Sequence, residues 1–171
     1  MKGAMQTALS PRTLPWIIAV LAAAVLTTAH ILEGFGWYPC ELCLEQRVPY
    51  WIGTGIALAA AVAALPRVNL PLISSLLMGA TALTFVVGMG LAIQHLGVEQ
   101  HWWKSTCAGG GGKSSIADLL SNVGKKPIVP CDEKRPFLFG LTLTNYNLLI
   151  SAALAFLAAS IPWRQMRSRT V

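Results

Sequence analysis

Charged residues are scarce in this 171-residue chain. They make up 12% of it, and only seven are Asp or Glu, whereas hydrophobic residues make up 54% and the mean hydropathy is +0.57. Soluble domains average about 25% charged residues, so this composition excludes an ordinary water-soluble domain and indicates a membrane protein. The net charge is +6, but the basic residues form no stripe interleaved with aromatic residues. This argues against a nucleic-acid partner.

Four apolar segments are long enough to be transmembrane helices, which need about 20 residues each. They lie approximately at residues 14–32, 48–65, 70–93 and 141–161. The sequence therefore predicts an all-α membrane protein, a four-transmembrane-helix bundle that forms a single integral membrane domain over residues 1–171. Outer loops at 33–47 and 94–140 share one side, and the termini share the other side with the short loop 66–69. Glycines in the spans favour close helix packing: Gly53, Gly55, Gly79, Gly88 and Gly90.

The distribution of charge predicts the orientation. The segments on the side of the termini carry six basic residues and no acidic one, as short cytoplasmic segments do: Lys2, Arg12, Arg67, Arg164, Arg167 and Arg169. The other side also has seven basic residues, so the argument depends on charge density in short segments. All six Trp residues fall near predicted span ends, where interfacial Trp is common. In an alternative, the first apolar segment is a cleaved signal peptide, but its apolar run exceeds the usual about 7 to 15 residues.

All four cysteines lie outside the predicted spans, on the side where disulfides persist. Cys40 and Cys43 form a C-x-x-C motif before the second span, and Cys107 and Cys131 lie in the long loop. The simplest arrangement pairs Cys40 with Cys43 and Cys107 with Cys131, although four cysteines allow three connectivities. In a C-x-x-C motif, the neighbouring thiol and a helix start favour a thiolate, which exchanges readily. The motif could also be an inert disulfide. A zinc site is disfavoured because a second C-x-x-C is lacking, so no metal site is predicted.

The long loop combines flexibility with one short helix. Gly109 to Gly112 follow Cys107 closely and give the backbone freedom to present that cysteine to another protein. Apolar residues at helical spacing then predict a short amphipathic helix, capped by Ser115 and Asp118 and stopped by Gly124: Ile116, Leu119, Leu120 and Val123. Whether this helix lies on the membrane surface or against the bundle, it keeps Cys131 near Cys40.

The run Pro39-Cys40-Glu41-Leu42-Cys43-Leu44-Glu45-Gln46-Arg47 matches the P-C-x-L-C-x-x-x-R motif of a known family. With the four spans and the second cysteine pair, the chain resembles the disulfide bond formation protein B family, DsbB. Segments that begin at His95, Cys131 and Phe139 are also similar to that family.

The resemblance implies a membrane thiol oxidase, a protein-dithiol:quinone oxidoreductase that supports disulfide bond formation. It would lie in the bacterial inner membrane, with cytoplasmic termini and periplasmic cysteine loops. A reduced DsbA-like thioredoxin-fold protein would attack the Cys107–Cys131 disulfide, and Cys131 would attack Cys40. Cys43 would then pass the electrons to ubiquinone or menaquinone. The chain also contains no flavin, haem or metal motif, which independently favours a lipid-soluble quinone as acceptor.

Two further residues are candidates for the quinone site. Arg47 follows Cys43 by four residues, so on a helix its guanidinium could stabilise the thiolate and donate to a quinone oxygen. Pro49 favours a helix start nearby, which leaves open whether Arg47 lies inside the helix. His95 matches a family histidine near the quinone. His30 and Glu33 are interpreted as a polar pair near the interface, and Glu45 and Gln46 have no predicted role beyond shaping the motif.

Two other functions fit parts of the pattern. One is a membrane reductase of the vitamin K epoxide reductase type, although its C-x-x-C lies late in the span order and this one precedes the second span. The other is a non-enzymatic scaffold stapled by disulfides. Disulfides that a reduced partner thiol cannot open would favour the scaffold.

Overall fold

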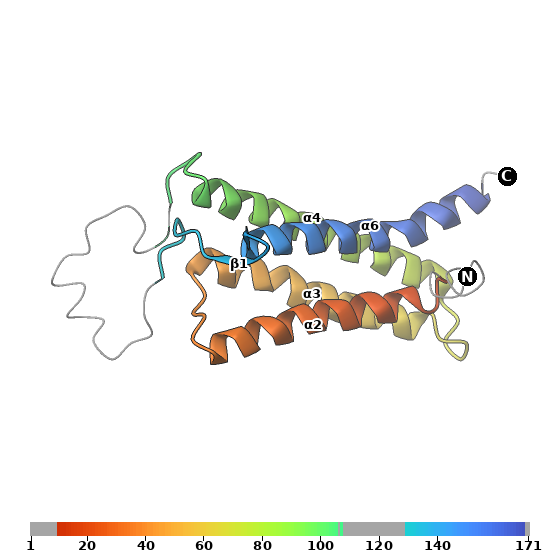
Figure 1. Ribbon diagram of the computed structural model, residues 1–171. Helices are drawn as coiled ribbons and strands as arrows, with labels where there is room; N and C mark the ends of the chain where they lie inside the picture. The colour runs from red at the N-terminus through yellow and green to blue at the C-terminus, as the bar shows by residue number, and fades with distance from the viewer. Residues whose placement is uncertain (1–9, 106, 108–128, 170–171) are drawn as a thin grey trace.

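The computed structural model describes residues 10–105, 107 and 129–169. Within these residues, four long helices lie side by side along one axis (Figure 1). They are α2 (Leu14–Gly34), α3 (Glu41–Ala63), α4 (Pro71–Glu99) and α6 (Leu143–Arg169). The α2–α3 connection lies at one end of the bundle, and the α3–α4 connection lies at the other end with the start of α2 and the end of α6 (Figure 1). Successive helices are therefore antiparallel.

The helices pack through small residues and a few large apolar ones. α4 packs extensively against α3 and α6, and α3 packs against α2, whereas α2 and α6 make few contacts. Gly53 on α3 lies against the Phe85 ring on α4, where an added Cβ would come within 2.8 Å of the ring. Gly88 similarly lies against Pro49, but Gly55, Gly79 and Gly90 have nothing within 4 Å of an added Cβ. Close packing therefore depends on two of the five predicted glycines.

Three of the described helices are long and apolar enough to cross a membrane: α2, α4 and residues 143–163 of α6. The chain is thus a helical integral membrane protein. α3 does not meet the same criterion, so four spans are not established as the sequence predicted. The reason is its polar content, because its first two turns contain Glu41, Glu45 and Arg47 and its middle contains Tyr50 and Thr54. A helix whose polar residues contact other helices need not be uniformly apolar.

α3 also begins earlier than the predicted span. It starts at Glu41 and includes Pro49 in its interior, so Cys43 and Arg47 both lie in its first two turns. Pro49 is buried, and its ring lies against Gly88 of α4. The absence of a side chain at Gly88 leaves room for that ring in the interior of the bundle.

A small β-hairpin precedes α6 and was not part of the all-α prediction. β1 (Pro136–Leu138) pairs antiparallel with β2 (Leu141–Thr142). Phe139 and Gly140 form the turn with φ of 51° and 75°, and two positive φ values suit a tight two-residue hairpin. The predicted amphipathic helix and the glycines after Cys107 lie outside the described residues.

Candidate functional site

The C-x-x-C motif forms the start of α3. Cys40 is the N-cap residue, and its sulfur accepts a hydrogen bond from the Cys43 backbone N–H at 3.4 Å. The two sulfurs are hydrogen-bonded at 3.0 Å, and both residues are free thiols. Cys40 is buried, whereas Cys43 is half-buried. The α3 N-terminus therefore places two sulfurs within the reach of exchange chemistry, with Cys40 in the capping position.

The surroundings of Cys40 favour its thiolate. A hydrogen bond from the Cys43 thiol is the main cause that lowers the pKa of Cys40 from 9.0 to about 4. The His95 ring and the Cys43 backbone N–H lower it further, against the opposing effect of burial. The shared proton between the sulfurs thus resides on Cys43, because Cys40 has the additional donors.

The second cysteine pair packs on the first. Cys107 and Cys131 are joined by a disulfide, and both are buried. They form one apolar cluster with Cys40, Leu42 and Val98, and Cys43 packs against this cluster. Segments separated by more than 60 residues in sequence therefore bring all four sulfur-bearing side chains into one region.

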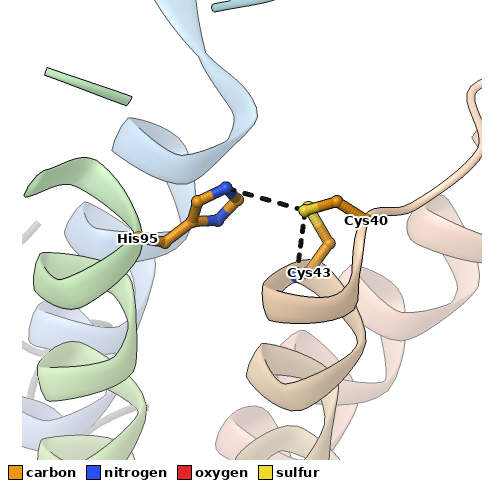
Figure 2. Close-up of side chains that lie close together, drawn as sticks. All are labelled: Cys40, Cys43 and His95. Carbon is orange, nitrogen blue, oxygen red and sulfur yellow. Dashed lines mark hydrogen bonds between the residues drawn. The ribbon is translucent and has the colours of Figure 1, made fainter. Parts of the chain in front are cut away.

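His95 extends from α4 toward the C-x-x-C motif (Figure 2). Its Nε2 lies 3.6 Å from the Cys40 sulfur, and its Nδ1 lies 2.7 Å from Gln46 Nε2 and 3.2 Å from Thr144 Oγ1. The ring is 3% exposed and also lies against the Cys131 backbone. His95 therefore contacts α3, α6 and both cysteine pairs.

A buried carboxylate lies behind this histidine. Glu99, one helical turn from His95, is 4% exposed, and its Oε1 lies 3.8 Å from His95 Nε2. It accepts hydrogen bonds from Thr144 at 2.5 Å and from Thr142 at 2.8 Å. A carboxylate this deeply buried is costly unless it is hydrogen-bonded, and the two hydroxyls supply that stabilisation.

The polar contacts continue from Gln46 along α6. Asn147 donates to Gln46 Oε1, and Tyr50 donates to Asn147 Oδ1 at 2.6 Å and bonds Ser151 at 3.0 Å. We refer to the hydrogen-bonded set of nine side chains as the polar network: Gln46, Tyr50, His95, Glu99, Thr142, Thr144, Asn145, Asn147 and Ser151. It connects α3, α4 and α6 at the cysteine end of the bundle.

Arg47 forms an ion pair with Glu33 of α2. Its Nη1 donates to Glu33 Oε2 at 3.0 Å, and both side chains are mostly buried. His30 Nδ1 lies 2.7 Å from the Leu26 carbonyl oxygen, and the His30 ring packs edge-on against Trp51. The Glu33 carboxylate lies against Arg47 of α3, a strong charged hydrogen-bond donor.

A cavity of about 750 Å³ lies against this site. Both cysteines of the motif, Arg47 and His95 line it, together with Cys131. Its other walls are mainly apolar and come from α2 and α6, including Leu21 and Leu154. Cavities of this size with a few polar groups in apolar walls are typical of small-molecule sites.

The sequence predicted the cysteines, Arg47 and His95 as site residues, and the structure places all six around this region. It missed Gln46, which was given no role beyond the motif, and Glu99, Thr144 and Asn147. The sequence did contain a signal for these residues, because amide and hydroxyl side chains in an otherwise apolar helix usually face protein partners. Their partners could not be predicted, since these contacts join residues 43 to 101 positions apart.

Comparisons with known proteins agree on one family. The family model for Disulfide bond formation protein DsbB matches residues 11–161. Disulfide bond formation protein B of Psychrobacter sp. (strain PRwf-1) is 26% identical over 178 residues, covering 97% of this chain and 99% of that protein. No solved structure matches the chain. Because the family model spans most of the chain, from α2 to α6 and through both cysteine pairs, the protein belongs to the DsbB family of disulfide bond formation proteins, an assignment that makes it an oxidoreductase.

Proposed function

We propose that this protein is a membrane thiol oxidase that reoxidises a periplasmic DsbA-like protein and passes the electrons to a membrane quinone. The observation that carries the proposal is the position of the cavity. Cys40 and Cys43 line it on one side, the Cys107–Cys131 disulfide packs against the same two cysteines, and apolar walls complete it. A donor disulfide, a dithiol and space for an acceptor therefore adjoin one another.

The thiol steps balance as two-electron exchanges. The partner's thiolate attacks Cys107, which breaks the Cys107–Cys131 bond and frees Cys131. Cys131 then attacks Cys40 of the oxidised motif, which breaks the Cys40–Cys43 bond and leaves Cys43 reduced. The partner's second thiol attacks its mixed disulfide with Cys107, so that the partner leaves oxidised, and the freed Cys107 attacks Cys131, which re-forms the Cys107–Cys131 disulfide and releases Cys40 reduced. When bound, a quinone supplies a two-electron, two-proton acceptor, which regenerates the Cys40–Cys43 disulfide.

The cavity suits a quinone in size and polarity. Its apolar walls from α2 and α6 match a hydrocarbon ring and tail, and Arg47 and His95 place hydrogen-bonding groups near the sulfurs. Arg47 is held by Glu33, which positions its remaining guanidinium donors. The polar network fixes His95 through Nδ1, which leaves Nε2 for exchange of a proton with the sulfur side.

The proposal includes four spans in a single membrane domain. α2 and α4 each qualify as spans, and both begin at the same end of the bundle (Figure 1). α3 must therefore return across the bilayer between them. Its 23 residues have a length of about 35 Å, enough for a hydrocarbon core of about 30 Å. The charge pattern puts the cysteine end in the periplasm and the termini in the cytoplasm of a bacterial inner membrane.

Quinone reduction by the purified protein tests this function. With a reduced thioredoxin-fold donor, the wild-type chain should consume quinone, measured by loss of its ultraviolet absorbance. Cys43→Ser should reduce the rate to the protein-free background, because no disulfide can then form with Cys40. A normal rate in Cys43→Ser would reject the proposal.

A second variant separates the two cysteine pairs. Cys107→Ser with Cys131→Ser should lose turnover driven by the protein donor, since the receiving disulfide is gone. Dithiothreitol, a small dithiol, should still drive quinone reduction through Cys40 and Cys43. Loss of both activities would contradict the proposed order of electron transfer, provided that circular dichroism shows intact helices.

A further inference from the structure

Three potential metal-ligating atoms lie close together in the structure, on Cys40, Cys43 and His95. The two sulfurs and one ring nitrogen all lie within 4.8 Å of one another. Figure 2 shows the His95 ring directed at the pair from a different helix. The cysteine spacing by itself disfavours zinc, whereas the structure adds a third ligand from a residue 52 positions beyond Cys43.

The separations are close to those of a zinc site. With Zn–S of about 2.3 Å and Zn–N of about 2.0 Å, tetrahedral angles require about 3.5 Å between a sulfur and the nitrogen. Cys40 Sγ and His95 Nε2 are 3.6 Å apart. The same geometry requires about 3.8 Å between two sulfurs, whereas they are now 3.0 Å apart. Zinc binding therefore requires the two sulfurs to move about 0.8 Å apart.

The surroundings of His95 prepare it as a ligand through Nε2. Metal-binding histidines usually donate their other ring N–H to a fixed acceptor. Here Nδ1 lies 3.2 Å from the Thr144 hydroxyl, which itself donates to the Glu99 carboxylate. When zinc replaces the proton on Nε2, Nδ1 carries the ring proton and donates it to Thr144, and the Gln46 amide, whose nitrogen is now 2.7 Å from Nδ1, turns its oxygen toward the ring.

We propose that the reduced protein binds one Zn²⁺ ion through Cys40, Cys43 and His95, with a fourth coordination position open to the cavity. Binding replaces thiol protons and transfers no electrons. Formation of the Cys40–Cys43 disulfide removes both thiolate ligands and releases the ion. Zn²⁺ therefore holds the pair reduced, and where the proposed oxidase function holds, it acts as a reversible inhibitor of that function.

Zinc titration of the reduced protein tests this site. The Cys107→Ser, Cys131→Ser chain in detergent is the background, since it has no other thiols. Competition with a chromophoric zinc chelator should give one Zn²⁺ per chain, and oxidation of the motif should abolish binding. His95→Asn keeps an amide near the Nδ1 position but lacks Nε2, so it should weaken binding by at least about tenfold. His101→Asn, at an exposed histidine outside the cluster, should leave the affinity unchanged.

X-ray absorption at the zinc edge provides a second measurement that needs no substitution. Two sulfur neighbours at about 2.3 Å and a nitrogen at about 2.0 Å are expected. A sulfur-free first shell, equal affinity in His95→Asn and the parent chain, or equal competition by Mg²⁺ would overturn the proposal. Neither experiment uses a quinone or a protein donor, so the result is independent of the oxidase function.

Discussion

Cys40 and Cys43 are three residues apart but differ in their chemistry. Cys40 is the helix cap and receives hydrogen bonds from the Cys43 side, with His95 close by. Cys43 lies one helical turn further along α3, and its thiol donates a hydrogen bond to the Cys40 sulfur. In a dithiol with this asymmetry, the residue that ionises first is Cys40.

The ionisation of Cys40 can be measured directly. Because its folded pKa is lowered from 9.0 to about 4, Cys40 is a thiolate above that pH and becomes protonated as the pH falls through it. At about pH 6, the reduced Cys107→Ser, Cys131→Ser chain should therefore show one thiolate by ultraviolet absorbance against its oxidised form. Cys43→Ala should lose most of this signal, because the main hydrogen bond is gone. The absence of thiolate absorbance at that pH in the Cys43-containing chain would disprove the assignment.

Arg47 is expected to act in acceptor binding. Arg47→Ala should raise the apparent KM for quinone by about tenfold, as loss of one charged hydrogen bond costs about 1.5–3 kcal/mol. Steady-state kinetics with varied quinone measures this.

Glu33→Gln is the matched control for Arg47. It removes the charge of the ion-pair partner but keeps a side-chain oxygen that can accept a hydrogen bond from the guanidinium. Glu33→Gln should therefore change the apparent KM for quinone only slightly. If Glu33→Gln and Arg47→Ala raised this KM equally, Arg47 would act only through its structural ion pair.

At this scale, the sequence pointed to candidate residues where a motif carried the information. Cys40, Cys43 and Arg47 belong to one short run, and His95 came from a family resemblance. Gln46 could not be assigned, because its role depends on His95 and Asn147 from two other helices. Glu99 was equally inaccessible, since only the fold places Thr142 and Thr144 against it.

At the scale of elements, α3 shows how tertiary packing overrides a local rule. Pro49 favoured a helix start near residue 48, yet α3 begins at Glu41. The Cys40 cap and Glu41 in the first turn stabilise the earlier start. Prolines are tolerated within membrane helices when neighbouring helices satisfy the freed backbone groups. The hairpin before α6 was missed because Phe139-Gly140 is not a common turn pair and its strands are only two or three residues long.

The α3–α4 contact predicts a difference between two glycines of α3. Gly53→Ala should destabilise the protein by about 1–3 kcal/mol, because the new methyl group would overlap the Phe85 ring. Gly55→Ala has open space around the new methyl group and should be neutral or stabilising by up to about 1 kcal/mol. Thermal unfolding in detergent compares them. A Gly53→Ala variant as stable as Gly55→Ala would show that this contact is not tight in the folded protein.

For the whole molecule, the up-and-down order and the shared end of the termini were predictable from the four apolar segments and their loops. The membrane-spanning character of α3 was not settled by composition, because it has the polar residues that the site requires. The position of the cavity was also beyond sequence reasoning, because its lining residues come from helices that are distant in sequence.

Topology is testable with fusions. A reporter that is active only in the cytoplasm should be active when fused after Val171, since the four proposed spans return the chain to the starting side. The same reporter fused after Gln100, at the end of α4, should be inactive. Activity in the second fusion but not the first would reverse the proposed orientation.

The sparse contact between α2 and α6 has a consequence for how this protein must be assayed. Leu21 and Leu143 line the cavity and are both exposed, and in the proposed membrane arrangement such an apolar opening faces acyl chains. A hydrophobic acceptor would then enter from the bilayer, and its effective concentration is its mole fraction in lipid or detergent. Apparent KM values quoted per litre should therefore rise in proportion to the amount of detergent added, and comparisons between preparations are meaningful only at equal amphiphile content.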